Sequence, residues 1–333
     1  MKNDVFVRYL IAAVLVLMAA LGVHLDASAG AMITDLKQQG KRMKFTNIFE
    51  PSGLLQLADG RLLLIEDKPA NPFSICRLVD SEGKPAIGAS VYCRMANTAD
   101  DLEGLTHGPG DWLYAITSHS RTESGEVNRE REKLLRFKID GEGGLQEYME
   151  HGELLPAMLE ALHSVAPAVN SINVEGLSSN RDRTNLLIGL REPVVAGASL
   201  VLTLINPAGM FERGERPQFA SEVIRLPLEG GGIRDIVFVE QLGGYLIANE
   251  IPQENGKLRA CLWLWDGVAG HEARRIDFPG SGKLKNIEGI SPVMLQNRAM
   301  LLLVCDDGDR QEGDAAHYRF VEYDKISKSS SGN

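Results

Sequence analysis

Short apolar stretches recur along the chain, and each follows a polar step that in most cases contains glycine. Five such units can be aligned, and in each unit a tight connection leads to a second apolar stretch. The paired stretches are Pro51–Leu55 with Leu62–Ile65, Leu102–Thr106 with Trp112–Ile116, Val174–Ser178 with Leu186–Ile188, Ile233–Val237 with Tyr245–Ala248, and Ile287–Ser291 with Ala299–Val304. Apolar runs of this length, bounded by turn residues, are typical of β-strands. The pattern therefore predicts five β-hairpins.

Further strands follow the hairpins in several units. The connections contain residues that favour tight turns, such as Ala58-Asp59-Gly60 and Leu242-Gly243-Gly244. Alternating stretches then come at Leu134–Asp140, Ser199–Leu204, Cys261–Trp265 and Tyr318–Tyr323. Three or four strands in a repeated unit are typical of a propeller blade. We therefore predict an all-β fold, a single β-propeller of five blades, with six as the alternative.

Two details of this propeller can also be predicted. The stretch from Met43 to Ile48 belongs to no unit, and we expect it to complete the last blade, because joining the two ends of the chain in one sheet removes free edges. Apolar residues recur at helical spacing from Glu153 to Val165, which predicts a short helical insertion on the outside of one blade.

The first 29 residues are typical of a signal peptide. Lys2 and Arg8 precede the apolar run from Tyr9 to Val23, which ends in Ala27-Ser28-Ala29. We predict cleavage after Ala29, export to the periplasm or the medium, and a single domain over 30–333 with a short polar tail from about 326. The alternative is an uncleaved anchor, which would be the chain's link to the membrane.

Charge and cysteine content narrow the picture further. The formal net charge is −10 and there is no basic block, so we expect no nucleic acid or anionic lipid as partner. Four cysteines permit two disulfides in an oxidising compartment, and Cys76 with Cys93 is the simplest pair because the two are only seventeen positions apart. The alternative is that all four, including Cys261 and Cys305, are buried thiols.

One position recurs at the start of each first strand, where a propeller gathers residues around its central channel. It is occupied by Ser52, Glu103, Glu175, Arg234 and Glu288. Converging carboxylates repel one another unless a positive charge lies between them. Arg234 supplies one such charge, and a hard cation such as Ca²⁺ could supply the rest, so Glu103, Glu175 and Glu288 form a predicted metal site. The alternative is that each glutamate caps its own strand.

The ends of the second strands form a further polar set. It comprises Glu66 and Asp67, Ser118 to Arg121, Arg191 and Glu192, Asn249 and Glu250, and Asp306 and Asp307. His119 is the candidate for acid–base catalysis, since histidine titrates near neutrality. Arg191 and Arg234 can hold a carboxylate or phosphate by bidentate contacts, or pair with the neighbouring acids instead. Arg121, Arg191, Arg234 and Asp235 are the predicted ligand-binding residues.

Several stretches resemble a bacterial family, domain-of-unknown-function family 3616 (DUF3616). They are Asp101–Leu105, Thr117–Arg121, Asn173–Leu177, Leu187–Val194 and Gly232–Ile236. The resemblance implies a propeller-like domain and no particular reaction. More distantly, the Glu-Gly step is similar to that of phytase-like and SdiA-regulated propellers, in which acidic residues near the axis hold calcium.

Two functions fit these observations. The first is a binding module for a small molecule or protein partner, with a calcium ion at the central channel. The second is a metal-dependent periplasmic hydrolase, a phosphoesterase or esterase similar to phytases. The sequence contains no Gly-x-Ser-x-Gly, no His-Glu-x-x-His and no Walker motif. This absence of a catalytic motif favours binding.

Overall fold

The computed structural model describes residues 42–67, 72–81, 83–93, 99–283 and 285–328. The predicted signal peptide lies outside these residues. Within them, no helix is long and apolar enough to cross a membrane.

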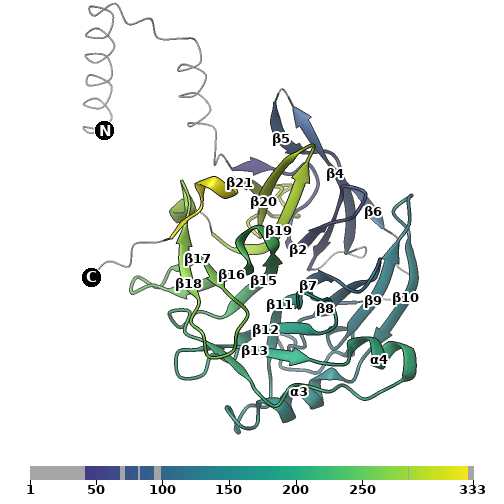
Figure 1. Ribbon diagram of the computed structural model, residues 1–333, viewed down its shortest axis with the longest axis vertical. Coiled ribbons are helices and arrows are strands. Elements are labelled where there is room, and N and C mark those ends of the chain that lie inside the picture. The colour runs from purple at the N-terminus through teal and green to yellow at the C-terminus, as the bar shows by residue number, and fades with distance from the viewer. Residues whose placement is uncertain (1–41, 68–71, 82, 94–98, 284, 329–333) are drawn as a thin grey trace, which may run out of the picture. The chain divides into compact units, whose positions relative to one another are not determined.

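The described strands form five antiparallel sheets arranged as the blades of a propeller (Figure 1). Consecutive innermost strands contact one another around the ring, and the last contacts the first. The innermost strands of blades 1 to 5 are β2 (Pro51–Gln56), β7 (Leu102–His107), β11 (Asn173–Ser179), β15 (Ile233–Val239) and β19 (Ile287–Leu295). The prediction of a five-bladed propeller is confirmed.

Each innermost strand pairs with a second strand, and the second pairs with a third. The second strands are β3 (Arg61–Glu66), β8 (Leu113–Thr117), β12 (Leu186–Glu192), β16 (Gly244–Pro252) and β20 (Arg298–Cys305). The third strands are β4 (Phe73–Ser81), β9 (Leu134–Ile139), β13 (Ser199–Leu204), β17 (Leu258–Trp265) and β21 (His317–Glu322).

The outer strands differ from blade to blade. Blade 1 has β5 (Lys84–Ile87) and β6 (Val91–Cys93), both paired with β4. Blades 2, 3 and 4 have β10 (Leu145–His151), β14 (Ile224–Leu226) and β18 (Arg274–Asp277). The outer strand of blade 5 is β1 (Met43–Lys44), which pairs with β21 as expected for a chain closed by its own N-terminal segment.

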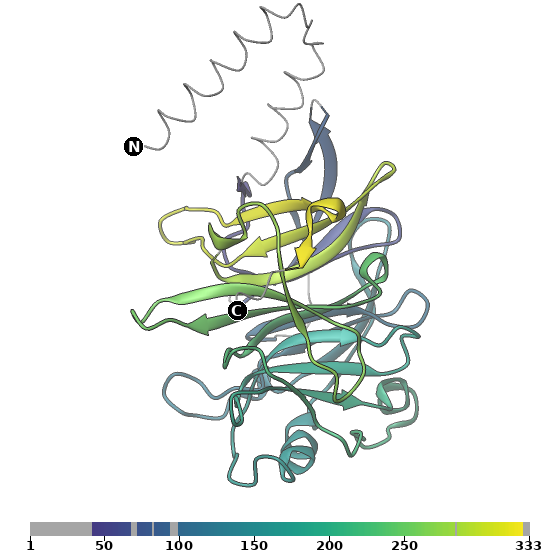
Figure 2. The same cartoon turned by 60° about the vertical axis from the view of Figure 1, so that its left-hand side comes forward.

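The C-terminal strand provides a second link that the sequence did not reveal. The segment expected to be a polar tail includes β22 (Ser327–Lys328), which leaves blade 5 and pairs with β18 of blade 4 (Figure 2). Asp277 and Ile276 are its partners in that strand. Both ends of the described chain therefore complete sheets.

Two helices lie outside the sheets. The predicted insertion is α3 (Leu154–Leu162), which buries Leu154, Met158 and Leu162 at the periphery of the ring (Figure 1). A shorter helix, α4 (Pro207–Arg213), follows β13; its Pro207 occupies the first turn, where a missing N–H costs nothing.

Five apolar cores fill the spaces between adjacent blades. A blade is buried on both faces, so its second strand is continuously apolar rather than alternating. In β3, Leu62 and Leu64 pack towards blade 5, whereas Leu63 and Ile65 pack towards blade 2.

The four cysteines are free and buried, so the predicted disulfide is wrong. Cys93 pairs with Phe73, three residues before Cys76 on the same strand. Cys76 faces the core between blades 5 and 1, while Cys93 faces the core between blades 1 and 2. Two thiols on opposite faces of a sheet cannot form a disulfide. The alternative prediction, that all four cysteines are buried thiols, is confirmed.

Candidate functional site

A β-bulge occurs at the same place in every blade. The pairing of the first two strands skips one residue near the start of each first strand. The skipped residues are Ser52, Glu103, Glu175, Arg234 and Glu288. A bulged residue is left out of the ladder and its side chain is re-aimed. The five positions aligned in the sequence are thus equivalent in three dimensions, and we call this end of the ring the channel mouth.

Glycine follows the bulge in four blades because adjacent inner strands come very close together there. A Cβ added at Gly104 would lie 2.5 Å from the Cβ of Leu177 on the next inner strand. Glycine is the residue that permits such a close approach.

Arg234 joins two of the glutamates into a buried ion-pair network. Its Nη1 lies 2.9 Å from Oε2 of Glu175, and its Nη2 contacts Oε1 of Glu288. The three residues are 8%, 2% and 4% exposed. The sequence predicts one shared site for Glu103, Glu175, Glu288 and Arg234, and the structure brings Glu175 and Glu288 into contact with Arg234.

Arg191 is the second arginine whose guanidinium group pairs with Glu175. Its Nη1 donates to Oε1 of Glu175 at 2.6 Å, and its side chain is 43% exposed. Burial raises the pKa of Glu175, and the charges of Arg234 and Arg191 oppose that rise. Arg191 and Arg234 therefore pair with acids of the channel mouth, which was one of the two alternatives left open.

Glu103 belongs to a different group of acids. Carboxylate oxygens of Asp67, Asp101 and Glu103 all lie within 4.8 Å of one another. Burial, together with the charges of Glu175 and Asp101, raises the pKa of Glu103 well above its usual value. Glu103 forms no hydrogen bond or ion pair with any residue that the structure describes.

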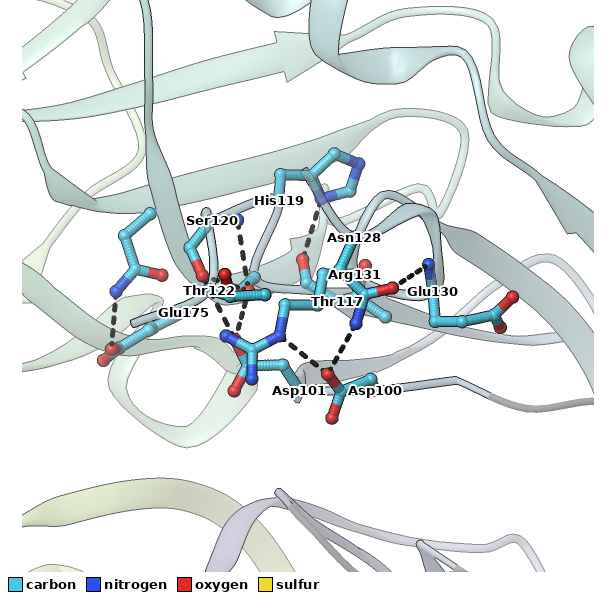
Figure 3. Close-up of polar contacts among 12 residues, drawn as sticks. Asp100, Asp101, Thr117, His119, Ser120, Thr122, Asn128, Glu130, Arg131 and Glu175 are labelled. Carbon is cyan, nitrogen blue, oxygen red and sulfur yellow. Dashed lines mark hydrogen bonds and ion pairs between the residues drawn. The ribbon is translucent and has the colours of Figure 1, made fainter. Parts of the chain in front are cut away.

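Asp101 is held firmly by its neighbours (Figure 3). Its Oδ2 accepts hydrogen bonds from the hydroxyls of Ser118 and Ser120 and lies 3.0 Å from Nη1 of Arg131. Burial alone would raise the pKa of Asp101, but Asp67, Ser118 and Arg131 lower it. Sequence reasoning missed Asp101 and Arg131, because Asp101 directly precedes the repeated unit and Arg131 lies outside it.

His119 lies near this group but its ring points away from Asp101 and Arg131 (Figure 3). The ring is buried, and Nδ1–H donates to the carbonyl oxygen of Thr117 at 2.8 Å. Burial lowers the pKa of His119 to about 4. The imidazole is therefore neutral at pH 7, and a catalytic role for it stays a prediction.

The remaining predicted residues lie apart from this network. Arg121 is exposed and donates to Gly125 within its own loop at 3.3 Å. Asp235 is buried, and its carboxylate accepts from the backbone N–H groups of Ile236 and Ile290 at 2.7 and 2.6 Å. Asp235 thus links β15 to β19, and burial raises its pKa to about 7.

Of the polar residues at the ends of the second strands, some lie at the channel mouth and others stabilise the contacts between segments of the fold. Glu250 lines the channel mouth, with its Oε2 3.9 Å from Nε of Arg234. Glu66 is fully buried and accepts from Phe49 N–H and from Arg310 at 2.9 and 2.6 Å. It ties blade 1 to the N-terminal segment and to the loop after β20.

A pocket of about 550 Å³ opens beside the Arg234–Glu175 pair. Its charged lining residues are Arg191, Glu192, Arg234 and Glu250. One wall is the glycine linker between blades 3 and 4, where a Cβ added at Gly232 would lie 2.1 Å from the carbonyl oxygen of Arg191. Gly231 and Gly232 have no room for a side chain, and sequence reasoning did not single out this linker.

Comparison with known families gives one match. Residues 124–248 match the family model described as "Protein of unknown function (DUF3616)", which supports the resemblance over that segment. The segment includes Glu175, Arg191 and Arg234. No curated protein sequence matches the chain.

Several solved structures are similar to this chain at low sequence identity. A putative oxidoreductase (glucose dehydrogenase) from Thermus thermophilus is 15% identical, with 85% of this chain and 100% of that chain covered and a TM-score of 0.41. The PQQ-bound aldose sugar dehydrogenase of Streptomyces coelicolor is 14% identical over 87% and 99%, with a TM-score of 0.42. The Malassezia sympodialis allergen Mala s 1 is 10% identical over 88% and 97%, with a TM-score of 0.47. Proteins this distant give no argument about the chemistry of the present site.

Proposed function

We propose that this propeller binds a divalent cation, Ca²⁺, through Asp67, Asp101 and Glu103, and a small molecule in the pocket lined by Arg191 and Arg234. The observation that carries the proposal is the position of Glu103. This carboxylate lies among other carboxylates at the channel mouth, and no described residue neutralises it by direct contact. A bound cation would remove that repulsion.

The charges at the channel mouth support a cation. The carboxylates of Glu103, Glu175 and Glu288 come from equivalent positions of three blades, and Asp101 lies close to Glu103. Among the described residues, Arg234 pairs with Glu175 and Glu288, Arg191 pairs with Glu175, and Arg131 lies beside Asp101. The carboxylate of Glu103 has no such partner, and a buried carboxylate among other carboxylates favours a hard cation with oxygen ligands.

The absence of a regular ligand cage among the described residues favours calcium over magnesium. Ca²⁺ binds oxygens at about 2.3–2.6 Å and accepts irregular geometry, whereas Mg²⁺ needs near-octahedral geometry at about 2.0–2.1 Å. The carboxylate oxygens of Asp67, Asp101 and Glu103 lie within 4.8 Å of one another, close enough to bind one ion.

Thermal denaturation with and without calcium tests the cation site. We expect CaCl₂ at about one hundred times its Kd to raise the Tm of the parent by roughly 5 °C, because the ion binds the folded state alone. The Glu103→Gln variant should fold and should lose most of that rise. Glu123→Gln, which changes an exposed carboxylate on a loop, is the matched control and should keep it. A parent whose Tm does not respond to calcium would refute the cation site.

A metal-dependent hydrolase, similar to phytases, is the second candidate. The observations in its favour are the group of carboxylates and the pocket that Arg234 lines, because a cation within reach of a bound ester or phosphoester could polarise it. His119 would have to act as the proton carrier. Turnover of a generic ester or phosphoester that disappears with a chelator would support the hydrolase, and calcium binding without turnover would support the binding module.

Export through the N-terminal segment also stays a proposal, tested by fractionating cells that express the full chain.

A further inference from the structure

The pocket beside Arg191 has charges of both signs and an apolar wall. We infer that it takes a small zwitterion, an α-amino acid with an apolar side chain. This inference rests on the proposed small-molecule function and names its ligand class. It does not depend on the calcium site.

A second β-bulge explains why two consecutive residues line the pocket. Asn173 pairs with Glu192 and Val174 pairs with Leu190, so Arg191 is skipped. In a regular strand, neighbouring side chains point to opposite faces, and a bulge breaks that alternation. Arg191 and Glu192 thus offer opposite charges to the same pocket.

Arg191 has donors to spare for a carboxylate. A guanidinium carries five N–H donors, and Glu175 accepts from one of its Nη atoms. Because the side chain of Arg191 is 43% exposed, a ligand can reach the others. Glu175, buried behind it, fixes the guanidinium in place.

Glu192 supplies the complementary charge for an ammonium group. Its side chain is exposed, and it forms no ion pair or hydrogen bond within the described chain. Unlike Glu175 and Glu250, it forms no ion pair with a described arginine that would compete with a ligand.

Charge balance favours the zwitterion over a simple ion. Arg234 and Glu250 line the pocket but are buried, and Arg234 is already paired with Glu175 and Glu288. The charges left for a ligand are those of Arg191 and Glu192. A plain anion would also meet the carboxylate of Glu192, and a plain amine would also meet the guanidinium of Arg191, whereas a zwitterion satisfies both signs.

The rest of the lining defines the side chain of the ligand. Val194, Pro252 and Leu258 provide apolar surface, and the described lining includes no aromatic ring on which a sugar or base could stack. The volume of about 550 Å³ is in the range of small-molecule pockets. An aliphatic amino acid such as leucine fits these features.

Isothermal titration with three matched probes tests the inference. Leucine carries both charges, 4-methylpentanoate lacks the ammonium, and 3-methylbutylamine lacks the carboxylate. We expect leucine to bind, and each analogue to bind at least about tenfold more weakly, because each loses one charge-assisted contact. Equal binding of leucine and 4-methylpentanoate, or no binding of leucine at about 10 mM, would overturn the inference.

Two variants assign the contacts. Arg191→Gln should abolish the preference for leucine over the amine, and Glu192→Gln should abolish the preference for leucine over the carboxylate. Arg181→Gln, which changes an exposed arginine paired with Glu240, is the control and should bind all three probes as the parent does. Unchanged preferences in both pocket variants would contradict the assignment.

The leucine titrations, taken together with the thermal denaturation with and without calcium, separate the two proposals. Leucine binding without a calcium response leaves the inference standing and removes the cation site. A rise in Tm with calcium but no binding of leucine leaves the cation site standing and removes the inference about the amino acid.

Discussion

Nη1 of Arg234 lies 2.9 Å from Oε2 of Glu175, and both side chains are more than nine-tenths buried. They come from the same bulged position of neighbouring blades, β15 and β11. The ring of equivalent residues thus contains its own counter-ion, and Arg234 also reaches Glu288 on the other side. This network divides the channel mouth into a neutralised part around Arg234 and an acidic part around Glu103.

Removal of Arg234 should destabilise the whole domain. In Arg234→Met, Glu175 and Glu288 lose their buried partner, and breaking such a pair costs about 3–5 kcal/mol. Urea denaturation measures the loss. The exposed pair of Arg181 and Glu240 is the control, and Arg181→Gln should change the free energy of unfolding by less than about 1 kcal/mol.

A second substitution shows whether the network is shared. Glu288→Gln added to Arg234→Met should recover part of the lost stability, because it removes one unpaired charge. Contacting residues couple by about 0.5–3 kcal/mol, so strictly additive effects would contradict a shared network.

Glu103→Gln should raise the Tm in calcium-free buffer near neutral pH. Burial and three neighbouring carboxylates raise the pKa of Glu103, so its charged form is unfavourable in the folded protein without a cation. Glutamine has the shape of the protonated acid and removes the repulsion. The calcium response of the parent should also weaken as the pH falls below the raised pKa, since protons then compete with the ion. A lower Tm for the variant without calcium would count against this account.

The fold could be predicted from the sequence because its signals are local and repeated. The five hairpins, the helix at 154–162 and the closing strand at Met43 all come from hydrophobic periodicity and turn residues. The strand at Ser327–Lys328 could not, because two polar residues pair with β18 through their backbone and leave no pattern. The predicted disulfide between Cys76 and Cys93 is wrong because the spacing of two cysteines in the sequence does not tell which face of a sheet each thiol occupies.

The sequence predicts those residues of the candidate site that occupy the same position in every repeated unit. It does not predict the residues that lie outside the repeat. The shared position of Glu175, Arg234 and Glu288 follows from the alignment of units. The grouping of Glu103 with Asp67 and Asp101 depends on how two blade loops meet, which no repeat encodes. Arg191 and Glu192 were visible as polar strand-end residues, but their common orientation depends on a bulge.

The N-terminal closure predicts a strong effect at one core residue. Phe45 follows β1, is 7% exposed and packs against Tyr318 of β21 with ring centroids 4.7 Å apart. We expect Phe45→Ala to cost about 3–5 kcal/mol in the free energy of unfolding. Lys44→Ala, which changes an exposed side chain next to it, should cost less than about 1 kcal/mol. Similar Tm values for the parent and Phe45→Ala would show that this segment does not close the ring.

Asp235 should make stability depend on pH between about 4 and 7. It stands where the other blades have glycine, and its carboxylate accepts two backbone N–H groups while almost fully buried. Burial raises its pKa from 3.8 to about 7, so in this range the folded protein holds a proton that the unfolded chain has released. The stability from this proton is complete below about pH 4 and is lost as the pH rises through 7. A difference of about three pKa units corresponds to a free energy on the order of 4 kcal/mol.

Asp235→Asn isolates this effect, because asparagine does not titrate. Its amide oxygen can still accept one of the two N–H groups, so the variant should fold with a lower stability in acid. Urea denaturation at about pH 4.5 and about pH 8 should show the parent losing its advantage over the variant as the pH rises. Asp111→Asn, at an exposed aspartate, should keep a constant difference from the parent and serves as the control. If the difference between the parent and Asp235→Asn also stays constant over this range, Asp235 is ionised throughout and its two N–H bonds outweigh the cost of burial.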